Sequence, residues 1–254
     1  MVSATVIYAA VPISAVVVLG LVRKWRSRNW AKCTSNTCLR GKTFLITGAN
    51  SGIGLETAKA LVKRKARVIF ACRDIEKAKQ AVAQIRHEQV TGGELIPMQL
   101  DLASFESIEK FVEVVKAGFN KIDVLINNAG VVIPLELDMK TKEGFEIHLG
   151  VNHLGHMYLT NLLLDLLKKA TPSRYFIKWY HYILMAPVAF LFMKSAKQGA
   201  ETVVFTATDY GIEGHSGKFY SNCAEYISPY PFDKNEETKL YERSEEMIKS
   251  RKPL

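Results

Sequence analysis

The sequence predicts an α/β protein built on a doubly wound parallel sheet, with a transmembrane helix at its N-terminus. Three observations lead to this prediction. Apolar strands alternate with amphipathic helices between residues 42 and 126, the first strand runs into a glycine-rich turn, and residues 5–22 carry no charge. With 254 residues, of which 48% are apolar and 23% charged, the chain can form one large domain, and this composition excludes wholesale disorder.

The N-terminal stretch at residues 5–22 is TVIYAAVPISAVVVLGLV, close to the ~20 apolar residues that cross a bilayer as a helix. Four cations follow within residues 23–28. Because the charge follows the apolar stretch instead of preceding it, we expect an uncleaved anchor with residues 29–254 facing the cytosol. A soluble protein with a buried N-terminal helix is the alternative, since Pro12 interrupts the stretch.

The excess of 34 Lys and Arg over 25 Asp and Glu gives a net charge of +9, which suits either nucleic acid or an anionic lipid surface. The cluster directly after the apolar stretch favours lipid, so we predict no nucleic-acid partner. Four scattered cysteines indicate a reducing compartment. Cys33 and Cys38 suit palmitoylation or a metal, but without clustered partners we expect free thiols and no metal site.

A strand at residues 42–47 leads into the turn Gly48–Gly54 and then into a helix with Leu55, Ala58 and Val62 on one face. Glycines allow the chain to reverse there and let the backbone approach a pyrophosphate, whose charge is met by N–H groups at the helix N-terminus. A glycine triplet alone is also compatible with a plain tight turn. The flanking strand and helix favour a dinucleotide site of the Rossmann type.

A second strand at residues 67–72 ends in Arg73 and Asp74, where a dinucleotide fold meets the adenosine ribose. An acidic residue there accepts from both ribose hydroxyls, whereas Arg73 offers a planar fork for a 2′-phosphate. This favours NADP. The alternatives are a solvated Arg73, with Asp74 as the ribose acceptor or as the cap of the next helix.

The alternation continues with strands expected over residues 95–102 and 122–126, each preceded by an amphipathic helix. In parallel sheets ligands bind at the carboxyl ends of the strands. Asp101 and the run Asn127–Gly130 stand at such ends, so we expect them near the same ligand.

Five motifs stand in one order along the chain: Thr47–Gly54 (TGANSGIG), Cys72–Asp74 (CRD), Asp101–Leu102 (DL), Asn127–Gly130 (NNAG) and Val151–His156 (VNHLGH). Over roughly residues 30–174 they resemble the short-chain dehydrogenase/reductases, and within them the membrane-anchored, NADP(H)-preferring retinol dehydrogenases. The resemblance implies that the glycine turn holds the pyrophosphate, Arg73 the 2′-phosphate and Asp101 the adenine. The implied NADP(H)-binding residues are Gly48, Ala49, Asn50, Ser51, Gly52, Ile53, Gly54, Arg73, Asp101, Asn128, Ala129 and Gly130.

Asn152 is implied by the resemblance to belong to the catalytic tetrad. It lies in a helical pattern predicted over about residues 143–169, beside a buried apolar stripe, where an Asn costs helix propensity and needs hydrogen-bond partners. His148, His153 and His156 lack carboxylate or thiol neighbours at ligand spacing, and we interpret them as ordinary helix residues.

After Arg174 the family pattern breaks. The resemblance leads one to expect a Ser, then a Tyr with a Lys four residues later that lowers the phenol pKa. No Ser occurs between Arg174 and Lys194, and no Tyr from Tyr158 to Tyr226 has a Lys at i+4. Tyr230 and Lys234 have the spacing, but the flanking prolines disfavour the helical turn that it needs.

The chain is also too short after its fourth strand. About two more strand–helix units of roughly 30 residues are expected, whereas residues 175–193 form one aromatic, apolar run. Residues 194–202 then resemble a later helix of the family, and residues 216–223 its last strand. We interpret this as an internal deletion. It predicts a sheet that is incomplete after the fourth strand, which becomes an uncovered edge, and a last strand without its neighbour.

We therefore expect an anchor and basic flank at 1–28, a linker at 29–40, a Rossmann portion at 41–174 and a truncated substrate and C-terminal portion at 175–254. Residues 175–193 are expected to be interfacial or poorly packed, and residues 234–252 to form a solvated helix. The family resemblance implies hydride transfer between NADP(H) and a lipophilic alcohol or aldehyde such as a retinoid, at the endoplasmic reticulum membrane. An inactive, membrane-tethered NADP(H)-binding remnant or partner protein is favoured for this chain; a chain that does not fold stably is the remaining alternative.

Overall fold

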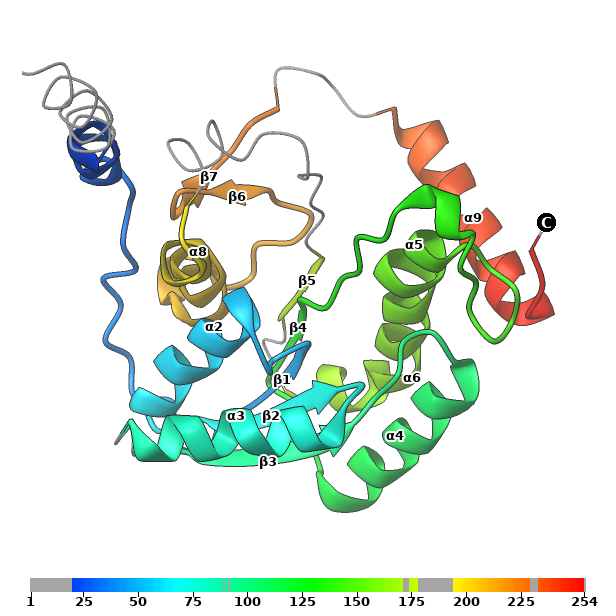
Figure 1. The fold of residues 1–254 in the computed structure, drawn as a ribbon, viewed down its shortest axis with the longest axis horizontal. Helices are drawn as coiled ribbons and strands as arrows, with labels where there is room; N and C mark the ends of the chain where they lie inside the picture. The colour runs from blue at the N-terminus through cyan, green and yellow to red at the C-terminus, as the bar shows by residue number, and fades with distance from the viewer. Residues whose placement is uncertain are drawn as a thin grey trace, which may run out of the picture.

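The computed structural model describes residues 20–88, 90, 92–170, 174–177, 194–228 and 233–253 (Figure 1). Its main sheet has five parallel strands in the order β3-β2-β1-β4-β5. The strands are β1 (Thr43–Thr47), β2 (Arg67–Cys72), β3 (Glu94–Gln99), β4 (Val124–Asn127) and β5 (Arg174–Ile177). This order confirms the doubly wound parallel sheet that the sequence predicts.

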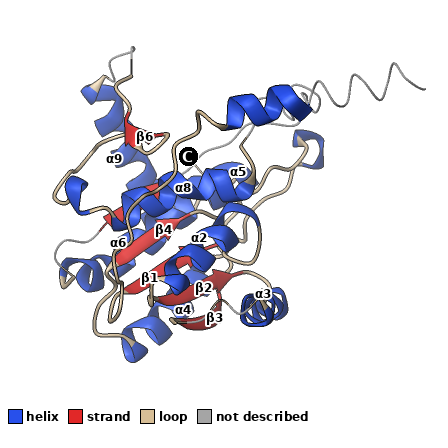
Figure 2. Cartoon of the chain, turned by 90° about the vertical axis from the view of Figure 1, so that its left-hand side faces the viewer, coloured by secondary structure: helices blue, strands red, loops and turns tan. Residues whose placement is uncertain are grey.

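Helices cover both faces of the sheet (Figures 1 and 2). One face carries α2 (Gly52–Lys63), α3 (Ile75–His87) and α8 (Ala196–Thr208). The other carries α4 (Phe105–Gly118) and a long helical segment made of α5 (Ile147–Leu149), the π-helix η2 (Gly150–Gly155) and α6 (His156–Lys168). Two short 3-10 helices, η1 (Leu135–Leu137) and η3 (Tyr210–Ile212), lie in loops.

The apolar strands supply both layers of the core because successive side chains point to opposite faces. In β1, Leu45 packs with α4 and α6, whereas Phe44 and Ile46 pack with α2 and α3. All three are buried. A continuous apolar run is therefore what a central strand of a parallel sheet requires.

The expectation that the sheet stops at its fourth strand is wrong. β5 pairs in parallel with β4, from Val124 opposite Arg174 to Asn127 opposite Ile177. The segment Arg-Tyr-Phe-Ile has the aromatic and β-branched character of a strand, and it follows α6 closely enough to reach the free side of β4. β4 is consequently not an uncovered edge.

The expected last strand at residues 216–223 does not join the main sheet either. Instead β6 (Tyr220–Ser221) and β7 (Ala224–Glu225) form a separate antiparallel pair. Asn222 and Cys223 between them have φ angles of 54° and 55°, as in a two-residue hairpin turn that needs two positive φ angles. The helix expected from residue 194 is confirmed as α8, which Ser195 and Gln198 begin with a capping box.

The C-terminal helix α9 (Lys234–Ser250) forms where a helix is predicted, but it is not fully solvated. Met247 and Ile248 are buried in the core cluster that contains α4 and α6. Arg251 forms an ion pair with Glu109, which also accepts a hydrogen bond of 2.5 Å from the phenol of Tyr158. Burial, with the Glu109 carboxylate nearby, raises the pKa of Tyr158 to about 12, so this phenol stays protonated. Sequence periodicity shows an apolar stripe here but not what it packs against.

At the N-terminus the structure describes a helix over residues 20–27, with Trp25 exposed. Among the described residues, none of the helices has the length and apolar character of a membrane span. The predicted span at 5–22 lies almost wholly outside these residues, and so does most of the predicted interfacial segment at 175–193.

Candidate functional site

The glycine turn after β1 is shaped by close backbone contacts. Gly48 has a φ of 66°, and a Cβ there would lie 2.9 Å from the Cα of Ala129. A Cβ on Gly54 would lie 2.5 Å from the carbonyl oxygen of Gly48 and 2.6 Å from Nδ2 of Asn128. Gly52 also has a positive φ, of 57°, but no atom comes within 4 Å of the place of its Cβ. The turn is therefore tightly packed at Gly48 and Gly54 and open at Gly52.

The first backbone N–H groups of helix α2 have no acceptor within the helix. Ser51 is its N-cap and makes no side-chain capping bond, and the first amide with a partner in the helix is that of Leu55, which donates to Ser51 at 3.2 Å. The N–H groups of residues 52–54 therefore have no intrahelical acceptor. The first turn of α2 carries no acidic residue, unlike the first turns of α3 and α4. This helix end suits an anion.

The three residues at the carboxyl end of β2, Cys72, Arg73 and Asp74, have different environments. Cys72 is buried, which raises the pKa of its thiol, and the N–H groups of Ala49 and Asn50 act in the opposite direction. Asp74 caps α3 by accepting from the N–H groups of Glu76 and Lys77 at 3.0 and 3.1 Å. Of the alternatives for Asp74, the structure thus has the helix cap.

Arg73 lies between these two residues and is exposed. Its guanidinium forms no ion pair with any described residue. Its backbone carbonyl accepts from Gln99 of the neighbouring strand at 3.4 Å. The charge of Arg73 is consequently available to a ligand at this edge of the site.

Thr47, the last residue of β1, organises the end of β4. Its buried hydroxyl accepts from the N–H groups of Asn128 and Ala129, both at 2.9 Å. The side-chain amide of Asn128 in turn donates to the carbonyl oxygens of Thr47 and Gly48 at 2.9 and 3.3 Å. The glycine turn and the NNAG motif are therefore one hydrogen-bonded unit, as their positions at adjacent strand ends predict.

Asp101 lies beyond β3, next to the β2 end. Its carboxylate accepts from the N–H of Ala103 at 3.0 Å, and its own N–H donates to the hydroxyl of Ser107 at the same distance. An open groove of about 560 Å³ runs past it, between the outer edge of β3 and the start of α4. Asp101 thus lines a hollow at the sheet edge that also holds Gln99, the residue bonded to Arg73.

Asn152 lies in the π-helix η2, in the middle of the segment that the sequence predicts as one long helix. Its side chain accepts from the N–H of Val131 at 2.8 Å and donates to the Val131 carbonyl at 3.0 Å. Both polar groups of Asn152 are used to hold the loop after β4, and π-helical turns are frequent at functional sites. His148 holds the same loop, because its Nε2 accepts from the N–H of Ile133 at 3.0 Å.

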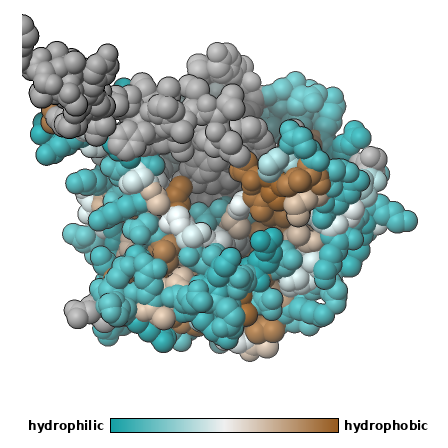
Figure 3. All heavy atoms as spheres, viewed as in Figure 1, coloured by the Kyte–Doolittle hydropathy of each residue, from teal (hydrophilic) through white to brown (hydrophobic). Residues whose placement is uncertain are grey.

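Apolar side chains gather beside α5 on the face shown in Figure 3. Val132, in the loop that Asn152 and His148 hold, is 53% exposed, and Leu137 and Met139 further along the chain are also exposed. An apolar surface therefore adjoins the segment that carries Asn152.

Tyr158 and Tyr230 are the tyrosines to compare with the acid–base Tyr that the resemblance implies. Tyr158 bonds to Glu109 and not to the loop after β4. Helix α9 begins at Lys234, so the spacing between Tyr230 and Lys234 does not fall within that helix, and Tyr230 itself lies outside the described residues. No group of three or more His, Cys, Asp or Glu side chains in the described part could hold a metal.

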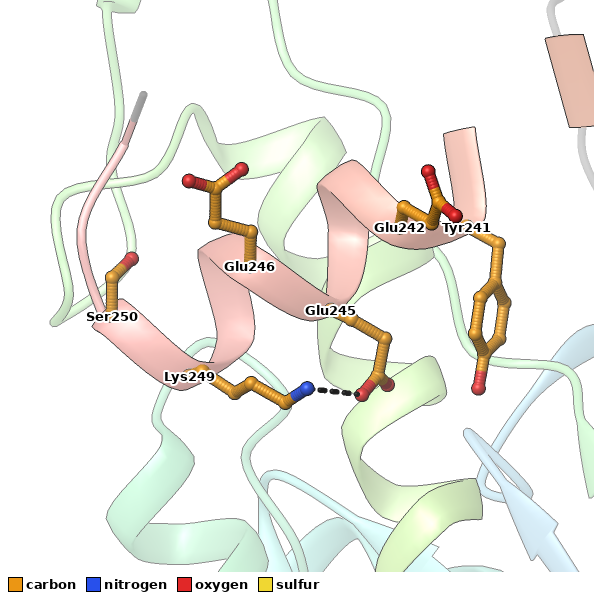
Figure 4. Close-up of a pocket in the computed structure, with 6 residues that line it drawn as sticks. All are labelled: Tyr241, Glu242, Glu245, Glu246, Lys249 and Ser250. Atoms are coloured by element: carbon orange, nitrogen blue, oxygen red, sulfur yellow. Dashed lines mark ion pairs between the residues drawn. The ribbon is translucent and has the colours of Figure 1, made fainter. Parts of the chain in front are cut away.

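A second hollow lies on α9 and is lined by that helix alone (Figure 4). Its side chains are Tyr241, Glu242, Glu245, Glu246, Lys249 and Ser250. Lys249 and Glu245 form an ion pair of 3.5 Å across it. No predicted site residue belongs to it, so we place the functional site at the strand ends.

Sequence reasoning missed the roles of Thr47 and His156. From the sequence, His156 is interpreted as an ordinary helix residue. In the structure it is 1% exposed, and its Nε2 lies 2.9 Å from the Thr47 hydroxyl. A signal was available, since a His four residues after Asn152 falls on the same buried face of the helix.

Parallel strands, a glycine turn against a helix N-terminus and a π-helical Asn beside them define a dinucleotide-binding α/β protein. The short chain dehydrogenase family model matches residues 42–174. The chain belongs to the short-chain dehydrogenase family.

Within that family the chain is similar to retinol dehydrogenases. It is 34% identical to human retinol dehydrogenase 14 over 295 residues, covering 83% of this chain and 87% of that protein. It is 50% identical to mouse retinol dehydrogenase 11 over 144 residues, covering 56% of this chain and 44% of that protein. The chain thus spans less than half the length of the second relative. Among solved structures, a metagenomic short-chain oxidoreductase in complex with NADP matches with 25% identity and a TM-score of 0.48, covering 67% of this chain and 75% of that one.

Proposed function

We propose that this chain is a retinol dehydrogenase-type protein that binds NADP(H) but does not catalyse hydride transfer. The observation that carries the binding half is the N-terminus of α2, where the N–H groups of residues 52–54 have no acceptor within the helix and no atom lies within 4 Å of the place of a Gly52 Cβ. A pyrophosphate fits there because it needs N–H donors, a favourable helix dipole and close backbone approach.

Arg73 favours NADP(H) over NAD(H). Its exposed guanidinium has no ion-pair partner among the described residues. It stands at the carboxyl end of β2, the strand end at which dinucleotide folds bind the adenosine ribose. A 2′-phosphate matches the planar fork of Arg73. Asp74 is a poor ribose acceptor, since its carboxylate already caps α3.

The remaining contacts follow from the strand ends. Asp101 lines the groove at the edge of β3, and in this proposal it contacts the adenine. Asn128 and Ala129 are hydrogen-bonded to Thr47 beside the glycine turn, and Gly130 follows them in the chain. In this proposal all three line the cofactor. In the undeleted parent NADPH would supply the hydride, whereas in this chain these residues would only bind and orient the cofactor.

The missing groups support the absence of turnover. Hydride transfer to a carbonyl also needs a positioned proton donor. The sequence has no Ser between Arg174 and Lys194, and no Tyr from Tyr158 to Tyr226 has a Lys at i+4. The family match ends at Arg174, where the sequence pattern breaks. Since 83% of a 254-residue chain is about 211 residues, about 84 of the 295 positions aligned with human retinol dehydrogenase 14 have no counterpart here. An internal deletion accounts for both facts.

The substrate class of the undeleted parent would be a lipophilic alcohol or aldehyde of the retinoid type. The names of the relatives support this, and so does the apolar surface of the loop that Asn152 holds. In this chain that surface remains, but the proton donor does not.

We also propose that residues 1–28 anchor the chain in the endoplasmic reticulum membrane with the rest in the cytosol. The support is the uncharged stretch at 5–22 and the four cations after it. In this proposal residues 29–40 form a linker, 41–174 the cofactor-binding portion and 175–254 the shortened remainder.

Two measurements on the detergent-solubilised full chain test the proposal. NADPH should raise the unfolding temperature, because a ligand that binds only the native state stabilises it, and NADH should do so less at equal concentration. Retinal with NADPH should give no product above the enzyme-free rate, with an intact retinol dehydrogenase as the positive control. Failure of NADPH to shift the unfolding temperature would remove the binding half. Turnover comparable with the intact enzyme would remove the other half.

A further inference from the structure

His156 is a buried polar side chain at the junction of three segments that the cofactor site uses. It begins α6, and its ring lies between the end of β1 and the π-helical turn of Asn152. Figure 1 shows β1 and β4 side by side in the sheet, so the same junction adjoins the loop after β4. Its imidazole is 1% exposed and contributes nothing to the surface.

The hydrogen bonds around Thr47 determine which ring nitrogen of His156 carries the proton. The Thr47 hydroxyl accepts from two backbone N–H groups, those of Asn128 and Ala129, which occupies both of its lone pairs. Its own proton must then be donated. Nε2 of His156 lies at 2.9 Å, whereas the Ile126 carbonyl lies at 3.5 Å. The hydroxyl therefore donates to Nε2, which leaves the proton of the neutral ring on Nδ1.

Nδ1 faces the backbone carbonyl of Asn152 at 3.4 Å, an acceptor that suits an N–H donor. Burial lowers the pKa of His156 to about 4, so the ring is neutral at physiological pH. A chain of bonds thus runs from the N–H groups of Asn128 and Ala129 through Thr47 and His156 to Asn152, whose side chain holds Val131.

We propose that His156 is a positioning residue for the cofactor loop at 128–131, acting through the Thr47 hydroxyl. Thr47 holds the start of this loop and Asn152 its end, while His156 contacts both holders. By taking the hydroxyl proton, the ring fixes the Thr47 rotamer in which both lone pairs face the loop. The inference rests on the proposed NADP(H) site for its functional consequence.

His156 could position the loop through Thr47 or only fill space in the core. If it only filled space, an apolar side chain of similar size in its place would leave the loop unaffected. In His156→Leu the NADPH dissociation constant should rise about tenfold, the usual effect of losing one buried hydrogen bond. Hydrogen exchange of the Asn128 and Ala129 amide protons should also become about tenfold faster. The amides in the centre of β2 should keep their protection from exchange. His156→Gln should retain most of the wild-type behaviour, because its Oε1 can accept from Thr47.

His153 offers a matched control on the same helical segment. Its Nε2 lies 2.8 Å from the hydroxyl of Ser244 in α9, away from the loop. His153→Leu should leave the exchange of Asn128 and Ala129 unchanged. Equal exchange in wild type and His156→Leu would overturn the proposal, as would a His156→Gln variant that behaves like His156→Leu.

The unsubstituted chain gives a test that does not depend on the folding of any variant. Nitrogen NMR of the His156 ring should show the tautomer with the proton on Nδ1; a proton on Nε2 would refute the assignment. If wild type fails to bind NADPH, the proposed function fails, but the amide exchange and the tautomer still decide the role of His156.

Discussion

Replacement of Arg73 by Gln tests the cofactor assignment most directly. Arg73 is exposed and forms no ion pair within the described part of the chain, so Arg73→Gln should leave the free energy of unfolding unchanged. Hydrogen bonds to charged groups contribute about 1.5–3 kcal/mol, and an exposed contact belongs at the lower end. A loss of about 1.5 kcal/mol weakens NADPH binding about tenfold. NADH, which lacks the 2′-phosphate, should bind as before.

The assay is titration of NADPH and NADH by isothermal calorimetry, with Arg67→Gln as the control. Arg67 stands at the other end of β2, where Nε lies 2.5 Å from Oε2 of Glu94, and about half of each side chain is exposed. Such surface pairs contribute about 0–1 kcal/mol to stability and lie away from the site. If Arg73→Gln kept the full preference for NADPH, or if Arg67→Gln lost it equally, the assignment of Arg73 would be wrong.

Three further predictions concern stability and binding. Gly54→Ala should abolish NADPH binding and lower the free energy of unfolding in urea by about 1–3 kcal/mol, because its Cβ would lie 2.5 Å from the Gly48 carbonyl oxygen. Gly118→Ala is the control, since no atom lies within 4 Å of the place of its Cβ. Equal effects of the two substitutions would contradict the steric argument. Met247→Ala should lower the free energy of unfolding by about 2 kcal/mol, and Leu240→Ala, at an exposed position, by less than about 0.5 kcal/mol. Equal losses would mean that α9 does not pack against α4 and α6. Acid should destabilise the wild type more than His156→Gln between pH 6.5 and 4, since burial lowers the pKa of His156 to about 4; parallel stability curves would contradict this.

The sign and size of the acid effect follow from linkage. The unfolded His156 titrates near 6.5 and the folded one near 4, so the unfolded state binds more protons between these values. Stability is therefore complete above about pH 6.5 and falls as the pH drops towards 4, by about 3 kcal/mol in total. Hydrogen bonds from His148 and Leu149 lower the pKa of Glu146 despite its partial burial. The contribution of such carboxylates to the stability of the fold is lost only at still lower pH. The difference between wild type and His156→Gln removes their contribution.

The first half of the fold could be predicted from the sequence because its determinants are local. The strand at Thr43–Thr47 carries its own apolar run, and the turn after it needs glycines at fixed positions, so both are legible in a short window. The order of the strands follows from the alternation with helices. The role of Asp74 as a helix cap was one of two alternatives, and only the position of its carboxylate separates them.

What could not be predicted depends on contacts between distant segments. Arg174–Ile177 is short enough to be read as the end of a helix connection, and only the free side of β4 makes it a strand. The bond between Thr47 and His156 joins residues 109 positions apart, which no periodicity reports. The docking of Met247 likewise depends on where α4 and α6 leave an apolar surface.

The proposed function treats cofactor binding and proton transfer as separable because they would rest on different parts of the chain. The two core clusters on either face of the sheet are built from β1 to β4 and the helices beside them, with α8 and α9 added from the C-terminal part. β5 covers the side of β4 that a break at Arg174 would otherwise leave open. The glycine turn, Arg73 and the loop at 128–131 all lie before Arg174, whereas the family resemblance implies that the Ser, Tyr and Lys come after it. Under the proposed function, loss of the second group removes the proton donor without removing the phosphate site, so NADPH should stabilise the chain without being turned over.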